Sequence, residues 1–232
     1  MKASFARWIT MLLCSVLMAS AVNAEENTTD PWQGFNRAMF NFNEGLDAYA
    51  LKPVAKGYKV VMPDLAERGV TNFFANLGDV SNVFNNLLQG KVDNALLSAA
   101  RLGFNTTFGL VGLIDVATPM GIQKQPEDFG QTLGYWGVDS GPYVVLPFFG
   151  PATVRDGLGR IPDSMIDPVM QVDDAGARNA LYLTRVVDTR AGLLQVEKLI
   201  SGDKYTFIRD AYLQKREYDI TDGAENYDDS NF

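Results

Sequence analysis

DPWQGFNRAMFNFNEGLDAY, residues 30–49, is the stretch that decides the fold class of this chain. Asp30 is a residue type that caps helices, and Pro31 suits the first helical position. Large apolar side chains follow at intervals of three and four residues, which places on one helical face Trp32, Phe35, Met39, Phe42, Leu46 and Tyr49. Asn36 and Asn43 fall on other faces. We therefore predict an amphipathic helix with an unusually wide apolar face.

Helical periodicity also dominates the rest of the chain, with prolines and glycines between the periodic segments. Pro53 and Pro63 allow only short helices beside them, and Gly78 and Gly90 are expected to end two others. The pattern predicts helices around residues 54–58, 64–77, 80–89, 93–108, 175–200 and 204–218. We expect a mainly α protein with Gly/Pro-rich loops and little β structure.

Residues 102–122 form the first of two unusual apolar blocks. They contain nine Leu, Ile, Val or Phe, four Gly, one Pro and a single charged residue, Asp115. On an insertion scale the apolar residues favour the bilayer by roughly 3–5 kcal/mol, and a central Asp costs about 3 kcal/mol. The balance does not support a complete membrane crossing. It leaves two interpretations open, a helix or hairpin that dips partly into a membrane, or a closely packed core segment.

Residues 133–151 form the second apolar block, and turn residues interrupt it repeatedly. Four glycines and three prolines separate its aromatic and branched side chains, so a continuous helix is not expected. We predict a loop with one short extended piece at residues 143–146.

The first 24 residues resemble a targeting segment. Lys2 and Arg7 precede an uncharged apolar run at residues 8–22, and small residues precede Glu25. This predicts a secretory signal peptide cleaved between Ala24 and Glu25. Lipidation at Cys14 is a competing use of the same segment, but its acceptor pattern is weak because the preceding residue is leucine.

Composition excludes several classes of function. The chain has no histidine, one cysteine and a formal net charge of -8. Catalysis by Ser-His or Cys-His pairs and histidine-ligated metals are therefore excluded, and a nucleic-acid partner is not expected. The adjacent acids at residues 127–128 and 173–174 are typical of solvated loops or helix caps. Gly157 and Gly159 only weakly suggest a phosphate loop, because no strand is predicted before them and a third glycine is missing. We expect no enzymatic activity, cofactor or metal.

Lys52, Lys56 and Lys59 are spaced to form one basic stripe on a helix. Such a stripe either contacts lipid phosphates or faces water. Likewise, the wide aromatic face and the two apolar blocks either form an ordinary core or contact amphiphiles. The combination of an export signal, abundant Phe, Trp and Gly, and no catalytic set favours a protein that handles amphiphiles, because moving a lipid requires no nucleophile.

The same stretches resemble the MlaA (VacJ) family of outer-membrane phospholipid transport proteins. The similarity extends from Asp30 to about Gly223, and its motifs are DPWQGFNR (30–37), NFN (41–43), LKPVA (51–55), NFFANL (72–77), NLLQG (86–90), NTT (105–107) with 109–115, DFGQTLG (128–134), GPYVVLP (141–147), RD (155–156), DTRA (188–191) and RDAYLQ (209–214). A match of this density is far more specific than any single short motif. The family is typically lipidated, and this chain departs from it in lacking a good lipidation motif.

The resemblance implies a single irregular helical, ring-like domain at residues 25–218, embedded in one leaflet of the outer membrane at its periplasmic face. An amphipathic channel would remove mislocalised phospholipids from the outer leaflet and pass them to a periplasmic lipid-carrier protein, which supplies an inner-membrane ABC transporter. Trimeric porins would be its membrane partners. An alternative is a structural porin-associated envelope protein that carries no lipid, and a carboxylate-based lipid hydrolase is a further one.

On this basis we expect two sets of residues on the lipid path or in the membrane. The first is a gate made by Asn41, Phe42 and Asn43. The second comes from the two apolar blocks and comprises Phe104, Phe108, Leu110, Val111, Leu113, Ile114, Tyr143, Val144, Leu146, Phe148 and Phe149. Residues 219–232, with five acids and no base, are expected to be a disordered tail.

Overall fold

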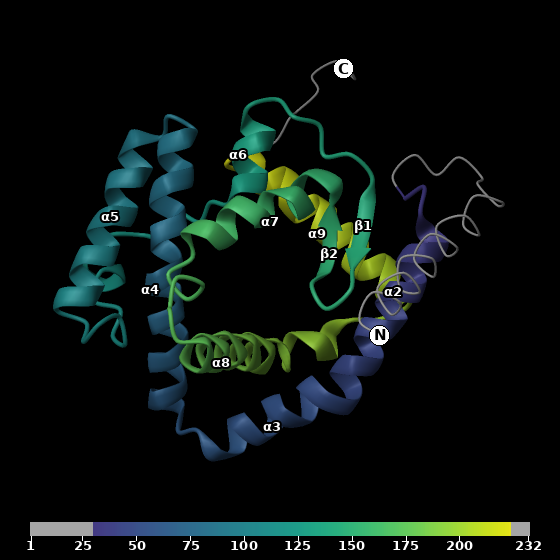
Figure 1. The fold of residues 1–232 in the computed structure, drawn as a ribbon, viewed down its shortest axis with the longest axis horizontal. Coiled ribbons are helices and arrows are strands. Elements are labelled where there is room, and N and C mark those ends of the chain that lie inside the picture. The colour runs from purple at the N-terminus through teal and green to yellow at the C-terminus, as the bar shows by residue number, and fades with distance from the viewer. Residues whose placement is uncertain (1–29, 224–232) are drawn as a thin grey trace, which may run out of the picture.

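The computed structural model describes residues 30–223, and in it the helices form a ring with one short hairpin on its inner side (Figure 1). The elements are α2 (Gln33–Leu46), a π-helical turn η2 (Asp47–Leu51), α3 (Lys52–Val61), α4 (Asp64–Leu88), α5 (Val92–Thr107), η3 (Thr118–Met120), α6 (Phe129–Tyr135), β1 (Tyr143–Leu146), β2 (Gly150–Thr153), α7 (Val154–Ile166), α8 (Ala175–Leu193), η4 (Val196–Leu199) and α9 (Lys204–Ile220). The predicted signal peptide, its cleavage site and Cys14 lie outside the described residues.

The ring has four sides in Figure 1. α4 forms one side and carries α5 on its outer face, while α3 and α8 lie side by side along the next. α2 closes the third side against β1, and α6 with α7 closes the fourth against α4. β1 and β2 are antiparallel, with Tyr143 opposite Thr153. Among the described residues, no helix combines the length and hydrophobicity that a membrane crossing requires.

α2, η2 and α3 form one continuous helix, so the predicted break around Pro53 is wrong. The N–H of Lys52 donates to the carbonyl of Asp47, five residues earlier, which is the bond of a π turn. A proline inside a regular α-helix lacks a donor and clashes with the carbonyl four residues earlier. The wider π turn directly before Pro53 relieves that clash, so the chain continues as helix to Val61. Asp30 also departs from its predicted role, because the helix begins at Gln33 and receives no side-chain cap.

α4 runs without interruption through Gly78, where the sequence predicted an end. A glycine inside a helix costs about 1 kcal/mol relative to alanine, which is a modest penalty against tertiary packing. α4 packs along α5 and also contacts α6, α7 and α8. These contacts hold the helix on both sides of Gly78. Helix propensity alone therefore predicted a helix end at Gly78, and tertiary packing keeps the helix continuous there.

The predicted loop at residues 133–151 is wrong at both ends, although β1 occupies the predicted residues 143–146. α6 continues to Tyr135, and its start has a capping box in which Asp128 and Gln131 bond each other's backbone N–H. β2 precedes α7, which the sequence did not predict at all. A Cβ on Gly159 would lie 2.7 Å from the backbone nitrogen of Gly130. The glycine at 159 therefore allows α6 and α7 to approach closely, and it does not form a phosphate loop.

The distribution of side chains in this fold is partly the reverse of that in an ordinary globular protein, because many apolar side chains are exposed and many polar ones are buried. The predicted apolar stripe at residues 32–49 is substantially exposed at Trp32, Phe42 and Tyr49, whereas Asn36 is 0% exposed. α4 and α5 share the pattern, because their buried residues are mostly polar, namely Asn76, Asp79, Asn82, Asn85, Asn86, Ser98, Arg101 and Asn105. Soluble monomers rarely expose large contiguous apolar surface, so this exterior is suited to contact with lipid or another protein.

The C-terminal helix extends beyond its predicted end at residue 218. α9 continues to Ile220, and Lys215 pairs with Asp219 at 2.6 Å. Asp222 pairs with Lys91 at 2.7 Å. The predicted acidic tail therefore begins too early, and its remaining residues, 224–232, lie outside the described part of the chain.

Candidate functional site

The turn after α5 presents an apolar tip to the outside of the molecule. Phe108, Leu110, Val111, Leu113 and Ile114 are between 45% and 68% exposed. Phe104 is partly buried and stacks on the ring of Phe108 with centroids 6.0 Å apart. The residues predicted from the first apolar block therefore gather at one end of the α4–α5 hairpin.

Polar side chains beneath the tip hold it in place. The Asn105 Oδ1 accepts hydrogen bonds from the N–H groups of Val116 and Ala117, and its Nδ2 donates to Asp115. Burial opposes ionisation of Asp115, but hydrogen bonds from Thr118 and Arg101 outweigh it and lower its pKa to about 2. Asp115, the single charge of this apolar block, is therefore paired and serves as an anchor.

The tip also requires unusual backbone angles. Leu110 and Val111 have φ of 53° and 60°, and Gly112 has φ of 90°. A side chain on Gly112 would lie 2.6 Å from Nδ2 of Asn76 on α4. Strained angles at non-glycine residues persist only where the surrounding structure enforces them. Close docking on α4 supplies that restraint here.

Asn43 joins the predicted gate segment to the second apolar block. Its Nδ2 donates to the carbonyl of Leu146 at 3.0 Å, and its Oδ1 accepts from the N–H of Phe148 at 2.8 Å. Beside it, the rings of Phe42 and Phe148 meet edge to face with centroids 5.4 Å apart. The structure therefore brings the predicted gate residues and part of the second apolar block together on the inner side of the ring, at the β1–β2 turn.

The remaining predicted residues divide between surface and interior. Asn41 is exposed, and Phe148 and Phe149 are 70% and 60% exposed at the turn. Val144 and Leu146 are partly buried. Tyr143 is only 1% exposed and packs with Tyr205 in the small aromatic core, out of reach of a lipid. The apolar tip at residues 104–114 lies on the opposite side of the ring from this turn (Figure 1).

A cavity of about 440 Å³ opens between α4, the β1–β2 turn, α7 and α8. Its apolar lining includes Leu77, Phe149 and Met170, and its charged lining comprises Asp128, Arg160, Asp163, Asp167 and Arg185. Of these, only Phe149 was predicted as a site residue. The others were missed because they come from α4, α6, α7 and α8, and only the arrangement of those helices in space brings them together.

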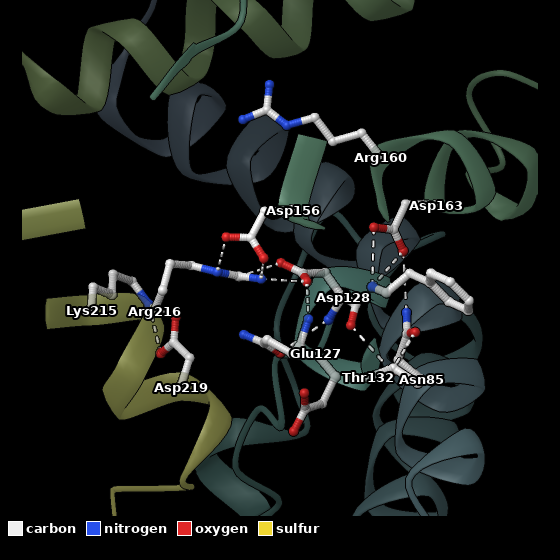
Figure 2. A network of polar contacts seen from close by, with 12 residues as sticks. Asn85, Glu127, Asp128, Thr132, Asp156, Arg160, Asp163, Lys215, Arg216 and Asp219 are labelled. Atoms are coloured by element: carbon white, nitrogen blue, oxygen red, sulfur yellow. Dashed lines mark hydrogen bonds and ion pairs between the residues drawn. The ribbon is translucent and has the colours of Figure 1, made fainter. Parts of the chain in front are cut away.

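Three of the five charged residues in this cavity are neutralised by direct partners. Arg185 pairs with Asp167 at 2.7 Å. Asp128 pairs with Arg216 of α9 at 2.6 Å, and Arg216 also bonds Asp156 at 2.9 Å (Figure 2). Burial works against the charge on Arg216, but its bonds to the two carboxylates prevail and raise its pKa above the ordinary value. This network fixes α6, α7 and α9 together behind the cavity.

The predicted lysine stripe lies along a second cavity, of about 670 Å³, between α3 and the end of α8. Lys52 pairs with Glu197 at 2.8 Å and Lys59 pairs with Glu67 at 2.6 Å. The stripe is therefore largely neutralised by neighbouring acids. Among residues 30–223, no cluster of three acidic, cysteine or histidine side chains could hold a metal ion.

Together these features define a class of protein: a mainly helical ring that turns apolar side chains outward and encloses charged ones. The model of the MlaA lipoprotein family matches residues 28–219. The chain belongs to this family, which confirms the resemblance seen in the sequence.

Similar proteins cover most of the chain. The intermembrane phospholipid transport system lipoprotein MlaA of Escherichia coli K12 is 37% identical over 213 residues, which is 89% of this chain and 84% of the relative. Its counterpart in Haemophilus influenzae is 32% identical over 93% of this chain and 90% of the relative. A structure solved to explain the maintenance of bacterial outer membrane lipid asymmetry matches with a TM-score of 0.73 and 35% identity, over 82% of this chain and 98% of that one.

Proposed function

We propose that this protein is the outer-membrane component of an intermembrane phospholipid transport system. It takes phospholipids that have strayed into the outer leaflet and passes them through the ring toward a periplasmic carrier, which delivers them to an inner-membrane ABC transporter. The result is maintenance of outer-membrane lipid asymmetry. Family membership supports the proposal, together with the functions named for the relatives.

The inverted polarity of the fold is the observation that carries this proposal. Lipid-facing backbone must be hydrogen-bonded internally, and helices meet that requirement while presenting apolar side chains outward. The apolar tip at residues 104–114 and the outer face of α2 and α3 suit the acyl-chain region of one leaflet. Val60, Val61 and Leu65 extend this exterior, each more than 80% exposed. Trimeric porins are the proposed protein partners of part of this exterior.

The lipid path in this proposal follows the inner side of the ring. Phe42, Phe148 and Phe149 supply apolar contacts at the β1–β2 turn, and the charged cavity beside Phe149 supplies contacts for a headgroup. Movement along such a path requires no bond to break, so the protein acts as a transporter component and not as an enzyme.

Lipid extraction from the protein purified out of membranes tests the proposal directly. We expect phospholipid to copurify, and we expect deletion of the gene to raise the phospholipid content of the outer leaflet. Phe42→Asp should fail to restore asymmetry, whereas Ala38→Asp, which adds the same charge at an exposed position one turn earlier, should restore it. Absence of bound lipid with unchanged leaflet composition would instead support a structural, porin-bracing role, and release of lyso-lipid would reveal a hydrolase.

A further inference from the structure

Within residues 30–223, Arg160 and Asp163 are the two charged residues of the 440 Å³ cavity that have no ionic partner. In the described part of the chain, Arg160 donates hydrogen bonds to two main-chain carbonyls, those of Phe149 at 3.3 Å and Pro151 at 3.1 Å. Among the described residues, no carboxylate lies within the 4.0 Å of an ion pair from its guanidinium. Arg160 therefore brings a full positive charge to the cavity that protein groups leave uncompensated.

Asp163 carries a negative charge and, among the described residues, likewise has no ionic partner. Its carboxylate accepts hydrogen bonds from the N–H of Phe129 at 3.1 Å and from Asn85 and Ser81 at 3.3 and 3.4 Å. All three donors are uncharged, and within residues 30–223 no cation pairs with it. Burial and the nearby Asp128 raise its pKa, despite these hydrogen bonds. The carboxylate would therefore gain from a cation placed in the cavity.

The two residues do not neutralise each other, although they are three positions apart on one helix. Figure 2 shows their side chains leaving α7 in different directions, with Asp163 toward the start of α6 and Arg160 away from it. The cavity thus presents one positive and one negative group, held apart, beside the apolar side chains of Leu77, Phe149 and Met170. A ligand that matches this arrangement carries both charges and an apolar tail.

We propose that this cavity binds the zwitterionic headgroup of a phospholipid with a primary amine, its phosphodiester on Arg160 and its ammonium on Asp163. The inference rests on the proposed lipid-transport function and names the headgroup class it favours. A guanidinium suits a phosphodiester because it offers two parallel N–H donors. A primary ammonium suits Asp163 because it donates hydrogen bonds, whereas a quaternary ammonium has no N–H to donate.

Calorimetric titration of the purified full-length protein with short-chain lipids tests this assignment. The probes are dihexanoyl phosphatidylethanolamine, phosphatidylcholine, phosphatidylglycerol and the neutral dihexanoylglycerol. We expect the ethanolamine lipid to bind most tightly. Arg160→Gln should weaken all three phosphodiesters by about tenfold and leave dihexanoylglycerol unchanged, and Asp163→Asn should weaken the ethanolamine lipid alone by about tenfold.

Arg178→Gln is the matched control, because Arg178 bonds the carbonyl of Val172 and does not line the cavity. Asp163 also caps α6, so its variant is informative only if its unfolding temperature matches that of the unmodified protein. If the unfolding temperature of Asp163→Asn differs, Arg160→Gln is compared with Arg160→Lys to test the headgroup site. Lysine keeps the positive charge, so Arg160→Lys should retain the preference for phosphodiesters over dihexanoylglycerol, and Arg160→Gln should lose it.

Two results would overturn the assignment in distinguishable ways. Unchanged headgroup preference in the Arg160 variants, with all four lipids still bound, would remove the headgroup site but leave the transport proposal intact. Failure of the unmodified protein to bind any of the four would overturn both.

Discussion

Arg216 and Asp128 meet through two hydrogen bonds, from Nη1 to Oδ2 at 2.6 Å and from Nη2 to Oδ1 at 2.9 Å. This pair ties the C-terminal part of α9 to the residue that caps α6. Because Arg216 also bonds Asp156 on α7, one side chain joins three helices that are separate in sequence. The closure of the ring behind the cavity therefore depends on one buried guanidinium.

Replacing Arg216 by glutamine should destabilise the protein by about 2–3 kcal/mol, because the buried Asp156 would lose its closer ionic partner and keep only Arg155, at 3.3 Å. Denaturant unfolding monitored by circular dichroism measures the change. Lys215→Gln provides the control, since the Lys215 side chain is 71% exposed and its removal should change stability by less than about 1 kcal/mol. Equal effects of the two substitutions would contradict the role assigned to the buried network.

Asn43→Ala should release the β1–β2 turn without unfolding the ring. The substitution removes the bonds to Leu146 and Phe148, so the Phe148 amide should exchange with solvent about tenfold faster. Hydrogen exchange resolved by NMR measures the rate. Asn41→Ala, at an exposed position two residues earlier, should leave it unchanged. A protected Phe148 amide in Asn43→Ala would show that other contacts hold the turn.

Gly112→Ala should destabilise the apolar tip by about 1–3 kcal/mol. A methyl group there faces both a left-handed backbone angle and the side chain of Asn76. Gly103→Ala, inside α5 with open space around its Cβ, should instead stabilise by roughly 0.5–1 kcal/mol. Thermal unfolding of both variants measures the contrast, and the same sign for both would contradict the conformation described for the tip.

Asp115 should make stability depend on pH in the acidic range. Its pKa is lowered in the folded protein, from 3.8 to about 2, so ionised Asp115 stabilises the fold above pH 3.8, and this contribution is lost as the pH falls through about 2. Asp115→Asn should therefore cost about 2 kcal/mol at neutral pH and nearly nothing below pH 2. Urea unfolding at a series of pH values measures the difference, and a gap that persists at pH 2 would assign the effect to something other than ionisation.

Local patterns predicted the elements whose signals are strong and self-contained. The extended piece at residues 143–146 and the start of α9 at Lys204 agree with the structure, and the helix predicted at residues 93–108 agrees to within one residue at each end, because periodicity and turn residues act over a few neighbours. The predictions at Pro53 and Gly78 are wrong because a π turn and helix packing offset local costs of a few kcal/mol or less. α7 was missed because glycines and a proline mask its period.

The candidate site was only partly predictable for a related reason. Phe42 and Phe148 were recognised as apolar residues in distinctive motifs, but their contact depends on two segments about a hundred residues apart. Asp163 carried no signal, since an isolated charge in a sequence is usually a solvated one, and Arg160 carried only the weak suggestion of a phosphate loop beside Gly157 and Gly159. The importance of the two residues becomes visible only in the structure, where neither has an ionic partner among residues 30–223.

The amino-acid sequence by itself determined the helical class, the absence of histidine chemistry and the family, because composition, periodicity and dense motifs are properties of the chain alone. Tertiary structure decided which face of each helix is exposed, how α6, α7 and α9 close the ring, and which opposite charges share one cavity without an ionic partner among residues 30–223. Burial and pairing depend on contacts between distant segments, and short-range patterns do not encode the geometry of those contacts.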